Sequence, residues 1–110
     1  MLLLLSCLSL SAQSSQQFKV LRYNGQQEKT PLQGVSVTAV NAGSKISDAD
    51  GKVMLQFRSL KVGEPLQFRR IEMSGYEVMN TEVVENMHIG AGELTIVMCS
   101  SDELARLRDG

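Results

Sequence analysis

The chain has 110 residues, enough for one domain around one core, and its 11 basic and 12 acidic side chains give a formal net charge of −1. The charges are spread along the sequence without a basic stripe, which argues against nucleic-acid binding. The sequence has no Trp, and a stacking platform for bases or sugars is hard to build from Phe18, Tyr23, Phe57, Phe68 and Tyr76.

The N-terminal stretch predicts export. Residues 1–10 read MLLLLSCLSL, which is too short to span a bilayer, where about 20 apolar residues are needed. They match the apolar region of a secretory signal peptide, and we expect cleavage after Ala12, although no Lys or Arg precedes the run. The alternative is a lipidated Cys7, because residues 4–7 match a bacterial lipoprotein box. Only in that case do we expect attachment to a membrane.

Cleavage after Ala12 would leave Cys99 as the single thiol of the chain. We expect Cys99 to end a strand and to pack as a small apolar residue. The alternative is a reactive thiol or a disulfide between two chains.

The clearest pattern lies in residues 45–57. After Asp48-Ala49-Asp50-Gly51, a typical turn sequence, Val53, Leu55 and Phe57 alternate with polar or exposed positions. We interpret the stretch as a hairpin of two strands whose apolar face is buried.

Similar alternation predicts strands at 18–23, 34–40, 66–71, 76–84 and 93–98. Residues 13–17 are polar, and we expect a disordered leader there. About seven short strands without helical periodicity between them favour an antiparallel β-sandwich.

The tail, residues 100–110, predicts the start of a helix. Ser101 or Asp102 can cap it, acids occupy the first turn and arginines the last. Leu104 and Leu107 form a narrow apolar stripe. Such a short helix either docks on the sandwich or begins a helical region that continues beyond this sequence.

Several stretches together resemble one family. They are PLxGVxV (Pro31 to Val37), SDADGKVML, PLQF and SGYEV, and they resemble the carboxypeptidase regulatory-like domain over residues 18–99. The resemblance implies a seven-stranded antiparallel sandwich of the transthyretin (prealbumin) type, without the zinc or catalytic residues of a carboxypeptidase. Such modules commonly follow the signal peptide of larger exported proteins, among them TonB-dependent outer-membrane transporters. Ser44 and Ser47 stand where the family usually has Thr.

The residues themselves predict no catalytic site, no cofactor and no metal site. Asp48 and Asp50 resemble the start of a calcium loop, but Ile46 and Phe57 stand where such a loop needs acids. His88 has no partner at a zinc-binding spacing.

Two further sequence patterns fail as functional motifs. Gly90 and Gly92 lack the third glycine of a dinucleotide site, where Thr95 stands. Ser74-Gly75 precedes a strand and is not a nucleophile elbow.

Methionine supplies the last candidate. We hypothesise that Met54 and Met79 lie on a sheet face that docks a neighbouring domain, because exposed Met suits adaptable surfaces. The alternative is that the methionines fill a core with few aromatic residues.

The sequence thus predicts an exported, non-catalytic β-sandwich module, in the periplasm or at the outer membrane, that binds a neighbouring domain or an envelope protein. The alternatives are a small secreted ligand-binding protein that acts alone and the N-terminal extension of a TonB-dependent transporter.

Overall fold

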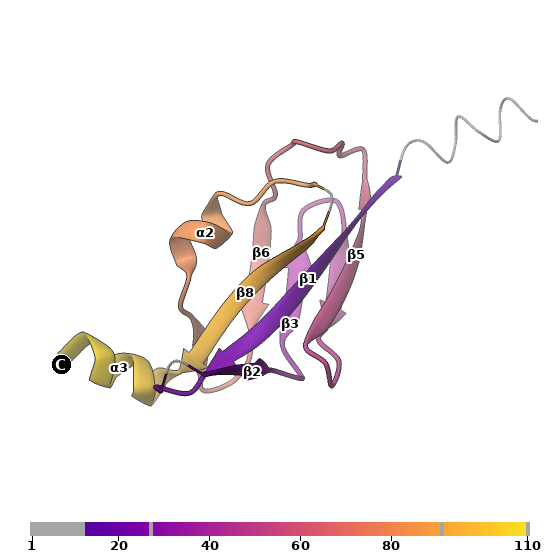
Figure 1. The fold of residues 1–110 in the computed structure, drawn as a ribbon. Coiled ribbons are helices and arrows are strands. Elements are labelled where there is room, and N and C mark those ends of the chain that lie inside the picture. The colour runs from indigo at the N-terminus through magenta and orange to yellow at the C-terminus, as the bar shows by residue number, and fades with distance from the viewer. Residues whose placement is uncertain (1–12, 27, 91, 110) are drawn as a thin grey trace, which may run out of the picture.

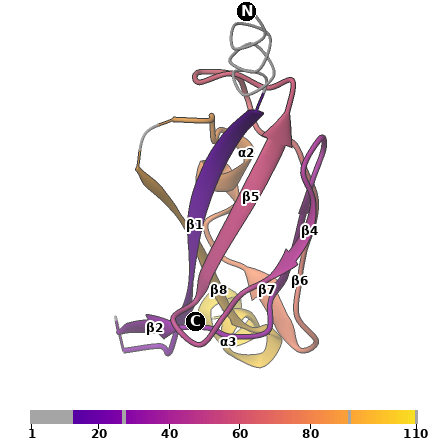
Figure 2. The same cartoon turned by 90° about the vertical axis from the view of Figure 1, so that its right-hand side faces the viewer.

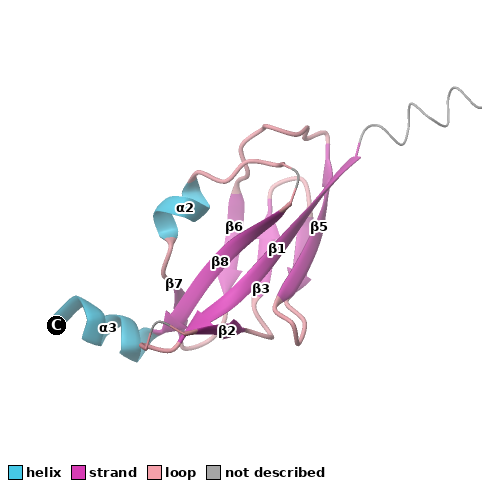
Figure 3. Ribbon diagram, viewed as in Figure 1, coloured by secondary structure: helices cyan, strands magenta, loops and turns pink. Residues whose placement is uncertain are grey.

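The computed structural model describes residues 13–26, 28–90 and 92–109, so the expected signal peptide and Cys7 lie outside the described residues. In the described part the protein is mostly β, with two sheets and a short C-terminal helix (Figures 1 and 3). No helix in this part is both long and apolar enough to cross a membrane. The elements are β1 (Gln13–Tyr23), β2 (Lys29–Pro31), β3 (Ser36–Ala39), β4 (Gly43–Ile46), β5 (Lys52–Arg58), β6 (Phe68–Glu72), β7 (Tyr76–Val78), α2 (Thr81–Glu85), β8 (Glu93–Ser100) and α3 (Ser101–Asp109).

Strand β1 is the centre of the larger sheet. On one side it pairs in parallel with β8, and β7 lies antiparallel beyond β8. On its other side, β5 pairs with the first part of β1 and β2 with its last three residues. The smaller sheet is antiparallel in the order β4-β3-β6.

The two sheets contribute to one buried core. In β5, Val53, Leu55 and Phe57 are buried and the residues between them are exposed, which confirms the alternation expected there. Phe18 of β1 meets Phe68 of β6 edge to face, with 5.5 Å between the ring centroids. This pair joins the two sheets, and such pairs add to the stabilisation from burial alone.

The strand count and directions differ from the expectation of seven antiparallel strands. The described residues form eight strands, and the β1–β8 pair is parallel. A short turn forces two strands to be antiparallel, but β1 and β8 are far apart in the chain and no turn joins them.

Residues 45–57 do not form a hairpin, because β4 pairs with β3 and β5 pairs with β1, in different sheets. The turn itself is confirmed: Asp48 Oδ1 accepts hydrogen bonds from the backbone N–H groups of Asp50 and Lys52, both at 2.9 Å. The turn therefore carries the chain from the smaller sheet to the larger one. Figure 2 shows β4 and β5 beside each other across this junction.

Gly51 ends this turn in close contact with two other segments. Its carbonyl accepts the N–H of Val20 at 2.7 Å, and the Val20 carbonyl accepts the N–H of Leu32 at 3.0 Å. Gly51 has φ +75°, and a Cβ there would lie 2.4 Å from the Val20 carbonyl oxygen. Only glycine combines this conformation with so close a backbone approach.

The expectation of a disordered leader was wrong, since residues 13–17 form the first half of β1. Gln16 points inward and is only 1% exposed. Its side-chain Nε2 donates to the Gly92 carbonyl at 2.9 Å, and its Oε1 accepts the Gly90 N–H at 3.0 Å. The amide can be buried because the 90–92 loop satisfies it.

The strand expected over residues 76–84 ends early, at Val78, and α2 follows it. Asn80 is the cause of the change. Its Oδ1 accepts the Val97 N–H at 2.9 Å and its Nδ2 donates to the Thr95 carbonyl at 3.0 Å. The side chain thus uses the groups of β8 that a longer β7 would have paired with.

The predicted C-terminal helix is present as α3, and it contacts β7 and β8. Its cap differs from the prediction, because the Glu103 N–H donates to the hydroxyl of Ser100 at 3.2 Å, and not to Ser101 or Asp102. Leu104 is buried and Leu107 is 44% exposed, so only part of the apolar stripe is used.

The Gly51 contact predicts a large effect of a single methyl group. We expect Gly51→Ala to lower the free energy of unfolding by about 3 kcal/mol or more, because it adds a backbone clash to the strain of a positive φ. Gly75→Ala is the matched control: φ is +83° and no atom lies within 4 Å of its added Cβ. Urea unfolding measures both, and equal losses for the two variants would show that the contact at Gly51 is unimportant.

The buried Gln16 amide gives a second prediction. Gln16→Ala leaves the Gly90 N–H and the Gly92 carbonyl without their partner, and we expect a loss of about 2–3 kcal/mol of stability. Gln17→Ala removes only an exposed hydrogen bond to Glu93 and should cost less than about 0.5 kcal/mol. Amide hydrogen exchange of Gly90 should accelerate in Gln16→Ala alone. Unchanged exchange there would contradict the role assigned to Gln16.

Candidate docking cleft

A cleft of about 690 Å³ lies between the end of β5 in the larger sheet and the β3–β4 turn of the smaller one. Two other hollows lined by described residues are smaller, with volumes of about 240 and 370 Å³. Both sheets contribute to its lining, which consists of Thr38, Ala39, Asn41, Ala42, Gly43, Gln56, Arg58 and Arg69.

The charged residues of the lining are both arginines, Arg58 and Arg69, and no acid lines the cleft. Neither guanidinium forms an ion pair with a described residue. Three other arginines do have partners: Arg70 lies 3.9 Å from Glu72, Arg106 lies 2.8 Å from Glu103, and Arg22 lies over the ring of Tyr76. The exposed Arg108, like the two cleft arginines, forms no ion pair with a described residue. No carboxylate of the described chain is therefore paired with the positive charge of the cleft.

The backbone around Arg58 is held in place. Its N–H donates to the Asn41 carbonyl at 2.8 Å, which fastens the end of β5 to the β3–β4 turn. Asn41 and the next residue after Arg58, Ser59, have φ of +69° and +64°, the positive values that non-glycine residues rarely adopt. Such conformations persist only where neighbouring structure fixes them. Arg58 thus starts from a fixed main-chain position.

The two consecutive arginines of strand β6, Arg69 and Arg70, have different surroundings. Thr38 of β3 is opposite Arg70, and the register shifts between Thr38 and Ala39, so that Arg69 occupies the irregular position. Arg69 lines the cleft and Arg70 pairs with Glu72. The irregularity is what directs Arg69 to the cleft, as β-bulges commonly do for side chains near binding sites.

A second hollow, of about 240 Å³, adjoins the first at Asn41. Its lining is different, with apolar side chains, one carboxylate and no cation: Val40, Asn41, Leu60, Glu64, Pro65 and Gln67. The Glu64 carboxylate already accepts the Lys61 N–H at 3.0 Å. A ligand that extends along both hollows would contact positive charge in the larger hollow and a mostly apolar surface in the smaller one.

This arrangement is suited to binding a negative group. A guanidinium presents several N–H donors in a plane that matches a carboxylate, and its charge does not depend on pH in the physiological range. Gln56 and Asn41 offer amide groups beside it. The cleft contains no His, Cys, Asp or Glu that could act as a base or nucleophile.

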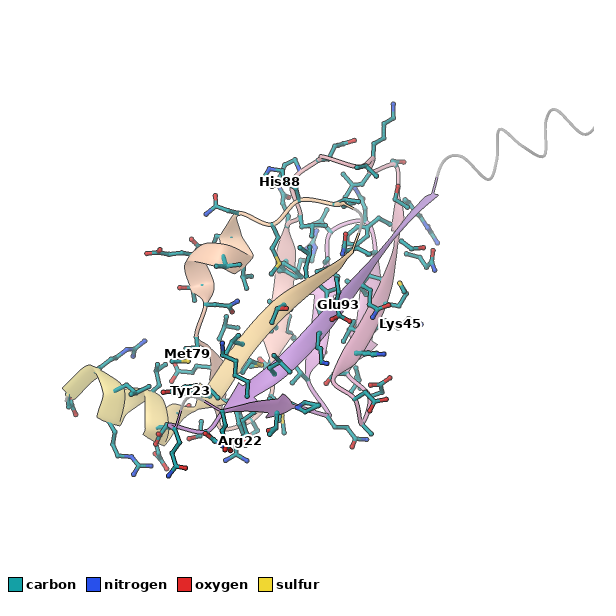
Figure 4. All side chains as sticks on the ribbon, viewed as in Figure 1. Arg22, Tyr23, Lys45, Met79, His88 and Glu93 are labelled. Carbon is teal, nitrogen blue, oxygen red and sulfur yellow. The ribbon has the colours of Figure 1, made fainter. Side chains whose placement is uncertain are left out.

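The candidates considered from the sequence lie elsewhere. Asp48 is used by its turn, and His88 sits on a loop at the end of the molecule opposite Arg22 and Tyr23, where its Nδ1 lies 2.8 Å from the Asn86 carbonyl (Figure 4). Gly90 and Gly92 are partners of Gln16. In the described residues, no three His, Cys, Asp or Glu side chains come close enough to hold a metal ion.

Cys99 is fully buried near the end of β8, as expected of a small packing residue. Burial raises the pKa of its thiol, the carboxylates of Glu103 and Glu77 raise it further, and Arg108 opposes them. A raised pKa keeps the thiol protonated and unreactive at neutral pH. Ser74 and Gly75 form the turn between β6 and β7.

The two methionines of the docking hypothesis do not form one patch. Met54 is 44% exposed on β5, and Met79, just after β7, is partly buried. Strands β1 and β8 lie between them in the sheet. Met87 and Met98 are core residues. Met54 instead borders a shallow hollow with Ser15, Gln17 and Glu93.

Sequence reasoning missed the cleft arginines. Arg58 continues the alternation of β5 on its exposed face, and two neighbouring residues of a strand such as Arg69 and Arg70 normally point to opposite faces. Neither pattern extends beyond its own strand. Arg58 and Arg69 come to one cleft through the pairing of β3 with β6 and through the hydrogen bond between the Arg58 N–H and the Asn41 carbonyl. Both contacts join residues that are distant in the sequence, so no local pattern predicts them.

Comparison with known proteins adds no family assignment: no protein-family model matches the sequence, and no curated protein or solved structure is similar to it.

Proposed function

We propose that this chain is an exported, non-catalytic β-sandwich module that docks a neighbouring domain or an envelope protein through the cleft lined by Arg58 and Arg69. The observation that carries the proposal is the uncompensated positive charge of that cleft. Both arginines are exposed and form no ion pair with a described residue, so they are available to a partner.

The proposal includes membership of the carboxypeptidase regulatory-like domain, with a sandwich of the transthyretin type. Its support is the set of sequence strings named above and a mostly β fold of two sheets with one core. In this family the module accompanies larger exported proteins, which agrees with a docking or structural role at the periplasmic side of the envelope. An apolar N-terminal stretch supports export.

The residues of the cleft suit the docking of a protein better than they suit a reaction on a bound ligand. The cleft offers charge, amides and a hydroxyl, and binding by such groups needs no titrating side chain. Two of the side chains considered from the sequence are engaged in structure: the Cys99 thiol is buried, and Asp48 holds its turn.

Site-specific photo-cross-linking in intact cells tests the proposal. A benzophenone amino acid at position 56, on the exposed face of β5 beside the cleft, should form an adduct with one envelope protein or with a further domain of the same polypeptide. The same group at position 82, exposed on α2, is the control. Sequencing of the linked segment by mass spectrometry identifies the partner.

The expected result is one defined adduct at position 56 and none at position 82. No adduct at position 56, or the same adducts at both positions, would refute docking through this cleft. The intact mass of the native protein, measured in parallel, tells whether the partner belongs to the same polypeptide.

A further inference from the structure

We infer that the docked segment is an acidic, extended stretch of protein whose carboxylates bind Arg58 and Arg69. This inference rests on the proposed docking function and specifies the chemistry of its partner. The cleft provides two cations and no acid, so a partner gains most from two negative groups placed a short distance apart. Consecutive or alternating Asp and Glu residues supply them.

The arginine side chains favour carboxylates because planar guanidinium groups bind them through two parallel N–H···O bonds. Position 58 is held at the main chain by the Asn41 carbonyl, and position 69 lies between Phe68 and Arg70, which pair with β3. Fixed main-chain positions reduce the entropy that is lost when a partner binds.

The lining of the adjoining hollow favours an extended protein segment as the docked partner. Beyond Asn41 the surface continues with Leu60 and Pro65, which suit an apolar side chain, and with the carboxylate of Glu64, which repels a further acid. A peptide whose acidic residues are followed by an apolar one satisfies both parts. A nucleic acid repeats its negative charge at every nucleotide and would place a phosphate near Glu64.

The strand β4 argues against recognition by strand addition along this seam. Lys45 of β4 is opposite Val37 of β3 and is exposed, so it places a charge on an edge strand. Figure 4 shows Lys45 beside β5. Charged residues of this kind prevent edge strands from pairing with other chains. The cleft therefore recognises side chains of the partner and not its backbone ladder.

A titration followed by NMR tests the inference with the full-length chain. The probes are a hexamer of glutamate, a hexamer of glutamine and inorganic phosphate. We expect the glutamate hexamer to shift the side-chain Nε–H signals of Arg58 and Arg69, and the backbone signals around Asn41, with an affinity at least about tenfold higher than the glutamine hexamer. Added salt should weaken this binding.

Matched variants assign the effect to the cleft. Arg58→Gln and Arg69→Gln should each weaken binding of the glutamate hexamer by about fivefold or more. Arg70→Gln changes the next residue of β6, which pairs with Glu72 outside the cleft, and should leave the affinity unchanged. The same spectra report whether each variant is folded.

Three results would overturn the inference: equal binding of both hexamers, phosphate binding as tight as that of the glutamate hexamer, or equal effects of Arg69→Gln and Arg70→Gln. The docking function itself would survive any of them if cross-linking at position 56 yields a defined partner segment that is not acidic. Loss of that cross-link would refute the docking function directly.

Discussion

The contact of Gly51 with Val20 is the constraint on which the arrangement of the two sheets depends. At this point the chain leaves β4 of the smaller sheet and enters β5 of the larger one. The Gly51 carbonyl is bonded to β1, and the Val20 carbonyl is bonded to Leu32 in the segment that leads to β3. Backbone groups alone thus tie β1 to two connections between the sheets, the β4–β5 turn and the segment that leads to β3. A side chain at Gly51 would separate them.

The cleft results from the path of the chain between β4 of the smaller sheet and β5 of the larger one. Strand β5 begins at this tied junction and ends at Arg58, whose N–H donates a hydrogen bond to the Asn41 carbonyl in the β3–β4 turn. Between those two points β4 and β5 lie beside each other without a strand pairing. An open seam between two sheets leaves room for side chains of a partner, and the arginines at its end supply the charge.

The sequence predicts local structure better than it predicts pairing. Alternation at Val53, Leu55 and Phe57 identified β5, and Asp48 identified its turn, because both depend on neighbouring residues. The partner of β5 was missed because a tight turn normally joins paired strands, and here Gly51 is bonded to β1 instead.

Two other differences have the same origin. The polar side chain of Gln16 suggests exposure to solvent, and its burial depends on the hydrogen bond with Gly90. The β-branched Val83 and Val84 favour a strand, but the side chain of Asn80 occupies the edge of β8. Predicting the cleft would have required contacts between strands of different sheets. Arg58 and Arg69 come from strands of different sheets, so neither periodicity nor composition brings them together.

The chemistry of the cleft suits binding. Arginine keeps its positive charge throughout the physiological pH range, so it binds an anion without any change of protonation state. The amides of Gln56 and Asn41 and the mostly apolar adjoining hollow add neutral contacts beside that charge. These groups fit the docking role proposed for the cleft, and the tied junction at Gly51 fixes the start of β5, the strand that ends at Arg58.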